Sequence, residues 1–191
     1  MRASIRSLVA TTVVLALAGC GSTRPDRPDA FETAELDRRE RRIVQGRAGP
    51  RDAGHERELA ALACRIDAVG CVPLRVYVLP RAGLQARLWP NDVLVVGSAL
   101  LELADRDEHA FALAHELGHR ALGHFRTRSR AATDMLELET AADAWARQRL
   151  LALGMRADAG VTLLTRLRGR LADADARGTV SRRIAALQAQ D

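Results

Sequence analysis

Lysine is absent from this chain: all 29 basic residues are arginine, against 24 acidic residues, and the formal net charge is +5. Exclusive use of arginine is more typical of a GC-rich genome than of selection for a polyanionic partner, so we expect no nucleic-acid partner. The densest basic cluster, residues 38–42, is interrupted by Glu40 and is most simply a solvated helix face, with anionic lipid head groups as the alternative contact. Internal repeats are also missing, which excludes a repeat architecture.

A long apolar run is missing as well, which argues against a transmembrane helix. Leu8–Ala18 is uncharged and mostly apolar, but it is too short to cross a bilayer comfortably, and it follows the basic residues Arg2 and Arg6. This order is typical of an export signal. We predict that residues 1–19 are a cleaved signal peptide.

The predicted signal ends in Leu17-Ala18-Gly19-Cys20, which resembles the lipobox of bacterial lipoproteins. The resemblance implies cleavage before Cys20 and lipidation of this cysteine, and Gly21 resembles the residue that sorts Gram-negative lipoproteins to the outer membrane. We therefore expect an outer-membrane lipoprotein that faces the periplasm and contacts the membrane through its lipid. An ordinary secretory signal with an incidental cysteine is the alternative.

Cysteine is scarce, with three in the chain. Once Cys20 is assigned to lipid, Cys64 and Cys71 remain as a pair in an oxidising compartment, on either side of a turn at residues 65–70. We expect a disulfide bond between them in preference to two free thiols. A zinc site at these cysteines is not expected, because residues typical of a metal site lie elsewhere.

Proline, glycine and apolar periodicity divide the rest of the chain. We predict that residues 20–54 are the lipidated cysteine and a tether that can include a short helix, and that residues 55–191 are the folded domain. The periodicity predicts strands at 72–79 and 93–96, and helices at 55–67, 98–103, 106–124, 133–153, 161–171 and 179–188. This is an α+β pattern, a mostly helical domain with a small antiparallel sheet.

The most informative motif is the HExxH run at residues 115–119, inside the expected helix 106–124. Residues four apart lie on the same face of a helix, so His115 and His119 can bind one metal ion with Glu116 beside them. This combination is typical of zinc hydrolases in which the glutamate is the general base.

The helix that carries the motif has its own signals. Asp105 and Glu108 form a capping-box pattern at its start. Gly118 destabilises a helix by about 1 kcal/mol relative to alanine, which indicates a close neighbour at that point. His124 is expected near the opposite side of the helix from His115, so we interpret it as a structural or exposed histidine. His55 and His109 are expected on the surface.

A zinc site in a hydrolase has three protein ligands and leaves a fourth position for water, so a third ligand is needed. The next expected helix offers Glu137 and Glu139, which lie about 200° apart around the helix axis, so only one can face the metal. Glu139 is followed one turn later by Asp143, which can accept a hydrogen bond from a ligand imidazole, and by the small Ala142. We predict Glu139 as the ligand.

The HExxH run followed by ExxxD on a second helix resembles the gluzincin metallopeptidases, and the fuller match is to peptidase family M48. Residues 93–101, the acidic pair Asp107-Glu108, the HExxH run and the later His124 carry the resemblance, which covers roughly residues 55–155. It implies a zincin-like domain with one Zn²⁺ per chain.

Carried over residue by residue, the resemblance makes His115, His119 and Glu139 the zinc ligands, Glu116 the general base and Asp143 the carboxylate that holds a ligand imidazole. It implies a zinc endopeptidase whose partners are misfolded or misassembled envelope proteins. The strand expected at 93–96 could accept such a substrate as an added strand.

The chain departs from the family pattern near its end. Members often carry a His-Pro pair ahead of a late Arg-Ile, whereas Arg177-Gly178 precede Arg183-Ile184 here. Arg177 is our candidate replacement for the histidine that would stabilise the transition state. Because that histidine is missing, a second function stays open, that of a zinc-bearing chaperone or assembly factor that binds outer-membrane proteins without cutting them.

Overall fold

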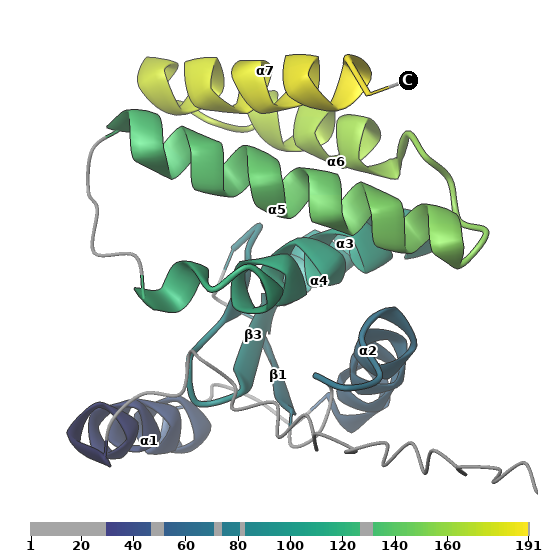
Figure 1. Ribbon diagram of the computed structural model, residues 1–191. Coiled ribbons are helices and arrows are strands. Elements are labelled where there is room, and N and C mark those ends of the chain that lie inside the picture. The colour runs from purple at the N-terminus through teal and green to yellow at the C-terminus, as the bar shows by residue number, and fades with distance from the viewer. Residues whose placement is uncertain (1–29, 47–51, 71–73, 81–82, 127–131, 191) are drawn as a thin grey trace, which may run out of the picture.

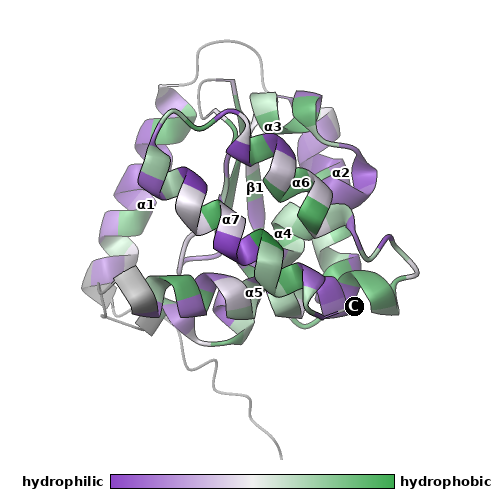
Figure 2. Cartoon of the chain, turned by 90° about the horizontal axis from the view of Figure 1, so that it is seen from above, coloured by the Kyte–Doolittle hydropathy of each residue, from purple (hydrophilic) through white to green (hydrophobic). Residues whose placement is uncertain are grey.

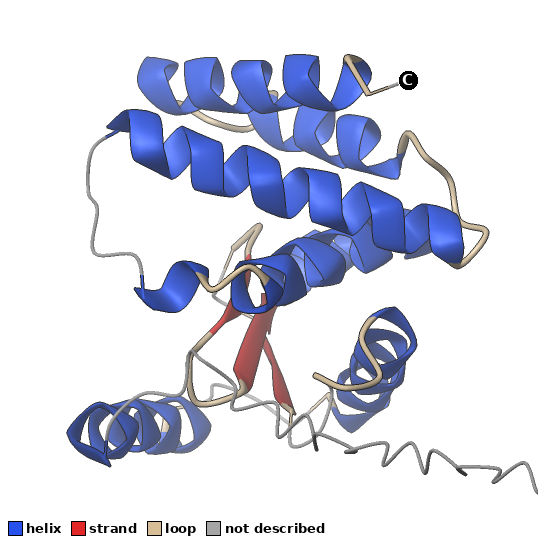
Figure 3. Ribbon diagram, viewed as in Figure 1, coloured by secondary structure: helices blue, strands red, loops and turns tan. Residues whose placement is uncertain are grey.

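The computed structural model describes residues 30–190 apart from 47–51, 71–73, 81–82 and 127–131, and Figure 1 shows the arrangement of this part. Seven α-helices, one short 3₁₀ helix and three strands make up the described chain, as Figure 3 shows by colour. In chain order they are α1 (Ala30–Gln45), α2 (Ala53–Ile66), β1 (Arg75–Leu79), β2 (Ala86–Leu88), β3 (Val93–Gly97), α3 (Ser98–Leu103), α4 (Arg106–Ala121), η1 (His124–Arg126), α5 (Ala132–Ala152), α6 (Ala159–Arg168) and α7 (Ala174–Gln188).

The sheet has the strand order β1-β3-β2, with β1 parallel to β3 and β2 antiparallel to it. The prediction of an antiparallel sheet is therefore wrong for the β1–β3 pair, whereas the α+β class is confirmed. All five residues of β3 are buried, as expected for a continuous apolar strand covered on both faces. The sequence prediction missed β2, because three residues with an arginine at their centre give little strand signal.

The two faces of the sheet pack against different helices. Figures 1 and 2 show α1 and α2 on opposite sides of the strands. The sheet face that packs against α2 and α4 is part of the main hydrophobic core. The other face, covered by α1, forms a smaller hydrophobic cluster around Trp89. Glu40 of α1 accepts hydrogen bonds from Arg75 Nε at 2.8 Å and Tyr77 Oη at 2.6 Å. The solvated face predicted for residues 38–42 is therefore wrong at Glu40, which faces the sheet.

Helix α4 starts as predicted, with a capping box between Asp105 and Glu108. It ends earlier than predicted, at Ala121, because Leu122 caps it and Gly123 follows with φ of 78°. The chain then turns into η1, so His124 lies off the α4 helix.

Gly118 allows α4 and α5 to approach closely, as predicted. A Cβ atom at Gly118 would lie 3.2 Å from the Ala142 carbonyl oxygen and 3.3 Å from Trp145 Cε3. Ala142 and Ala146 are fully buried on the facing side of α5. The HExxH face of α4 therefore lies directly against the α5 residues that follow Leu138.

The amino-terminal predictions fall mostly outside the described residues: the signal peptide, Cys20 and the segment 21–29 all do. Cys64 takes part in a disulfide bond, but Cys71 lies outside the described residues. Among the helices described, none is both long and apolar enough to span a membrane.

Candidate metal centre

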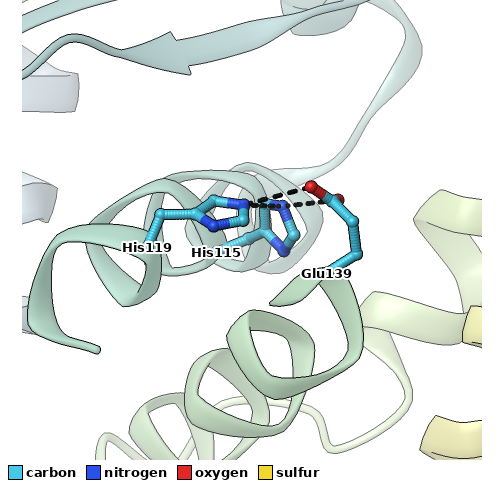
Figure 4. Close-up of side chains that lie close together, drawn as sticks. All are labelled: His115, His119 and Glu139. Atoms are coloured by element: carbon cyan, nitrogen blue, oxygen red, sulfur yellow. Dashed lines mark hydrogen bonds and ion pairs between the residues drawn. The ribbon is translucent and has the colours of Figure 1, made fainter. Parts of the chain in front are cut away.

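Three side chains from α4 and α5 converge on one point. His115 and His119 come from successive turns of α4, and Glu139 comes from α5; Figure 4 shows both imidazoles directed toward the carboxylate. The His115 and His119 Nε2 atoms lie 3.1 Å apart, and each lies 3.3 Å from a Glu139 carboxylate oxygen. These are three donors of the types that bind zinc.

The spacing of these atoms fits a metal ion. Zinc bonds of about 2.0–2.2 Å at tetrahedral angles place neighbouring ligand atoms about 3.3–3.5 Å apart. The observed separations of 3.1 and 3.3 Å lie close to that range. Glu137, the competing carboxylate, is exposed on another face of α5 and is not part of this group.

His115 is oriented by a buried pair of charges. Its Nδ1 lies 2.8 Å from Asp143 Oδ1, and Arg183 of α7 donates to both Asp143 oxygens at 2.7 Å. Arg183 Nη1 also lies 2.9 Å from Glu139 Oε2. With a proton on Nδ1 shared with Asp143, the Nε2 lone pair of His115 faces the centre.

His119 is oriented by a second histidine. Its Nδ1 lies 2.9 Å from His124 Nδ1, so one of the two nitrogens must donate and the other accept. If the His119 Nδ1–H donates, the two neutral rings direct their Nε2 lone pairs at Glu139, and a bound cation or a proton on Nε2 relieves the repulsion. His124 therefore contacts the centre through His119. The sequence analysis missed this role because it extended the helix to residue 124, which placed His124 on the side away from His115.

Charge in the site favours a divalent cation. Burial lowers the pKa of His115, but hydrogen bonds with Asp143 and Glu139 outweigh it and raise the pKa to about 9. Burial raises the pKa of Glu139 and Asp143, but hydrogen bonds with the histidines and Arg183 outweigh it and lower both. When both imidazoles are neutral, as metal ligands must be, and Glu116 is ionised, three carboxylates face one guanidinium, which leaves two negative charges for a divalent cation to neutralise.

Glu116 lies beside the centre without joining the ligand group. Its Oε2 accepts a hydrogen bond from the Leu88 backbone N–H of β2 at 2.8 Å. Burial raises the pKa of Glu116, although the nearby histidines and this hydrogen bond oppose the change. A carboxyl group with a raised pKa and a fixed orientation is suited to accept a proton and return it.

The centre opens into a cleft of about 590 Å³. The β2 segment and α1 line one part of it, and the faces of α4 and α5 that carry His115, His119 and Glu139 line another, together with Arg183. Most of the remaining lining side chains are apolar, among them Leu100, Phe111, Phe125, Met135, Leu138, Leu163, Leu164 and Leu167. A site of this kind can hold an extended apolar or mixed chain.

Arg177 does not reach this cleft. It is exposed, and its Nη1 donates to the Leu171 and Ala172 carbonyl oxygens at 2.9 and 2.6 Å, which ties down the turn between α6 and α7. The arginine at the centre is Arg183, to which the sequence analysis assigned no role. The Arg183-Ile184 pair of the family resemblance was the available signal.

The remaining tryptophan and histidine side chains lie outside the ligand group. Trp89 is buried under α1, and Trp145 packs against the main core. His55 is exposed and bonds Asp52. The surface position predicted for His109 is wrong, because this side chain is partly buried and its Nε2 is enclosed without a hydrogen-bond partner in the described chain.

Comparison with known proteins gives one family. Residues 55–176, from α2 to the first turn of α7, match the sequence profile of peptidase family M48. A search of curated proteins finds no match. The matched segment contains His115, Glu116, His119, Glu139 and Asp143, and it leaves out α1.

Proposed function

We propose that this chain, which belongs to peptidase family M48, is a zinc-dependent endopeptidase. Membership makes it a metallopeptidase in general terms; the ligand set and the type of cleavage are our proposal. The observation that carries it is the spacing of the His115, His119 and Glu139 donor atoms, which suits one tetrahedral zinc ion.

The chemistry follows from the groups around that point. Bound zinc would polarise the scissile carbonyl and lower the pKa of water in the site. The Glu116 carboxylate would accept a proton from the attacking water and deliver it to the leaving amide nitrogen. The Leu88 N–H holds that carboxylate in place, and its raised pKa suits both halves of the transfer.

The substrate would bind along β2. The prediction that β3 accepts an added strand is wrong, because β3 already pairs with β1 and β2. Gln85 and Trp89, which flank β2, bond to β3 through their backbones, so by antiparallel alternation Ala86 of β2 turns its N–H and C=O away from β3. Since Glu116 bonds the neighbouring Leu88, a chain paired with this edge would lie beside the general base.

Cleavage of misfolded or misassembled envelope proteins by an outer-membrane lipoprotein remains our proposal for the biological role. Two observations support export: the signal and lipobox pattern that ends at Cys20, and the disulfide bond of Cys64, which is typical of an oxidising compartment. Recognition of backbone at β2 suits substrates that share an unfolded state rather than a sequence.

A non-proteolytic chaperone or assembly factor is the second candidate. It is favoured by Arg177 and Gly178, which stand where family members often have a histidine and which lie outside the cleft. Such a protein would use the same β2 edge to hold a chain without cutting it.

Unfolded casein distinguishes the two functions. We expect the zinc-loaded protein to cleave casein, chelator to stop cleavage and added zinc to restore it. Glu116→Gln should retain zinc and lose cleavage, because only the base is removed. Metal content and proteolysis are measured on the same sample. Cleavage by this variant at the wild-type rate would contradict the mechanism, whereas casein binding without cleavage by wild-type protein would favour the chaperone.

A further inference from the structure

Helix α1 lies outside the segment that matches the family, yet it supplies part of the cleft wall. Leu36 and Arg39 of α1 line the same cleft as Glu116. The helix is held in place by the bonds of Glu40 to Arg75 and Tyr77. This wall therefore lies outside the matched segment, and it touches the space in which a substrate would bind.

Arg39 and Arg87 form a basic rim on that wall. The Arg39 guanidinium carbon lies 5.0 Å from the centroid of the Trp89 ring, over which it stacks. Side chains two apart in a strand share a face, so Arg87 of β2 lies on the same face of the sheet as Trp89. Both arginines are exposed and line the cleft.

The charges of these two arginines are not neutralised by the described chain. Within the described residues, neither guanidinium bonds to a carboxylate, whereas Arg183 on the opposite wall bonds Glu139 and Asp143. An exposed arginine by itself is usually a solvated surface group. Arg41 of α1 is of that kind, because it is exposed and does not line the cleft.

We propose that Arg39 and Arg87 make this enzyme select substrate segments with an acidic side chain next to the bond that is cut. The inference rests on the proposed endopeptidase function, and it adds a substrate class to it. A chain paired with the β2 edge presents alternate side chains to the α1 side of the sheet, where a glutamate or aspartate would meet the two guanidinium groups.

The expected size of the preference is modest, because the two arginines are exposed. Each exposed arginine–carboxylate pair should change kcat/KM by about 3-fold, and both together by about 10-fold at low ionic strength. Added salt should reduce the preference, since exposed charges are screened.

The test uses quenched-fluorescence peptides that are identical except for glutamate or glutamine, placed in turn at each position around the scissile bond. Wild-type protein is compared with Arg39→Gln, Arg87→Gln, the double variant and Arg41→Gln, all with measured zinc content. We expect the glutamate-to-glutamine ratio of kcat/KM to exceed one in wild type at one or more positions and to approach one in the double variant. Arg41→Gln, which makes the same charge change on the same helix, should keep the wild-type ratio.

Equal cleavage of both peptides by wild type, or an equal loss of preference in Arg41→Gln, overturns the proposal while the endopeptidase function stands. If no peptide is cleaved, the endopeptidase proposal fails. Fluorescence anisotropy of the same labelled peptides with the Glu116→Gln protein then decides the arginine proposal separately. The arginine proposal is supported if the Glu116→Gln protein binds the glutamate peptide more tightly than the glutamine peptide and loses this difference when Arg39→Gln and Arg87→Gln are added. Equal binding of the two peptides by the Glu116→Gln protein refutes the proposal.

Discussion

His115 shows how one residue links the centre to the rest of the protein. One ring nitrogen faces Glu139 and the other faces Asp143, which Arg183 of α7 holds from the opposite side. The proposed third ligand, Glu139, can be compared with Glu137 on the same helix. We expect Glu139→Ala to lose zinc and Glu137→Ala to keep it, because Glu137 is exposed away from the centre.

Metal titration of the two purified variants measures this difference. Asp143→Asn should weaken zinc binding by roughly 10- to 100-fold, as is typical when a partner of a ligand histidine is changed. A dispensable Glu139 and an essential Glu137 would contradict the ligand assignment.

His124 provides a second prediction at this scale. Its Nδ1 lies 2.9 Å from His119 Nδ1, so His124→Ala should leave the His119 ring without its partner and weaken zinc binding by roughly 10- to 100-fold. His55→Ala is the control, because His55 is exposed and its ring bonds Asp52 alone among the described residues. Equal zinc affinities for the two variants would show that His124 does not orient His119.

Because His115 titrates, we expect the Tm of the protein to depend on pH in opposite directions with and without metal. Without metal, its folded-state pKa of about 9 exceeds the ordinary value of 6.5, so the protonated ring stabilises the fold. This contribution is complete below pH 6.5 and is lost as the pH rises through about 9. The Tm of chelator-treated protein should therefore fall over that range.

The Tm of zinc-loaded protein should show the opposite pH dependence. Protons compete with the metal for the imidazole nitrogens, so its Tm should fall as the pH is lowered. Melting curves of both forms across this range check the prediction, and parallel curves would contradict it.

At the scale of elements, the contact between α4 and α5 sets the geometry of the site. Gly118→Val would place a branched side chain against the Ala142 backbone and force the helices apart, which should separate His119 from Glu139. We expect zinc affinity to fall at least about 10-fold. Ala141→Val is the control, because Ala141 is exposed on α5. Zinc titration with a thermal melt of each variant separates loss of the site from loss of the fold.

Some helix and strand features could be predicted from the sequence and others could not, for physical reasons. The α4 start and the close approach at Gly118 follow from local rules of capping and helix propensity, so both were predictable. The end of α4 at Ala121 was also signalled, by Gly123, but it was missed. Strand β2 and the pairing of β3 on both sides depend on tertiary contacts that no short window contains.

The candidate site was predictable to the same limited extent. His115, His119 and Glu139 lie at fixed spacings on two helices, so helix periodicity is enough to bring them together. Arg183 is remote in sequence and reaches Asp143 only because α7 packs on α5. Arg177 was the wrong choice of arginine for the centre, because distance along the chain cannot tell which turn of α7 faces α5.

For the whole molecule, the proposed lipid anchor at Cys20 is open to the simplest test. Cys20→Ala should leave the precursor unlipidated and move the protein out of the outer-membrane fraction, since the sequence offers no other long apolar segment to hold it there. Fractionation followed by immunoblotting measures the change. Unchanged fractionation of the variant would contradict the lipoprotein proposal.

The short interval between Cys20 and the start of α1 at Ala30 has a consequence for reach. Ten residues can extend about 35 Å at most, so a lipid on Cys20 would keep α1 within that distance of the bilayer. Because α1 is itself a wall of the cleft, the cleft of a lipidated protein would stay close to the membrane surface. Substrates would then be selected partly by their position. Chains at the membrane surface would lie within reach of the cleft, whereas chains farther away in the periplasm would not.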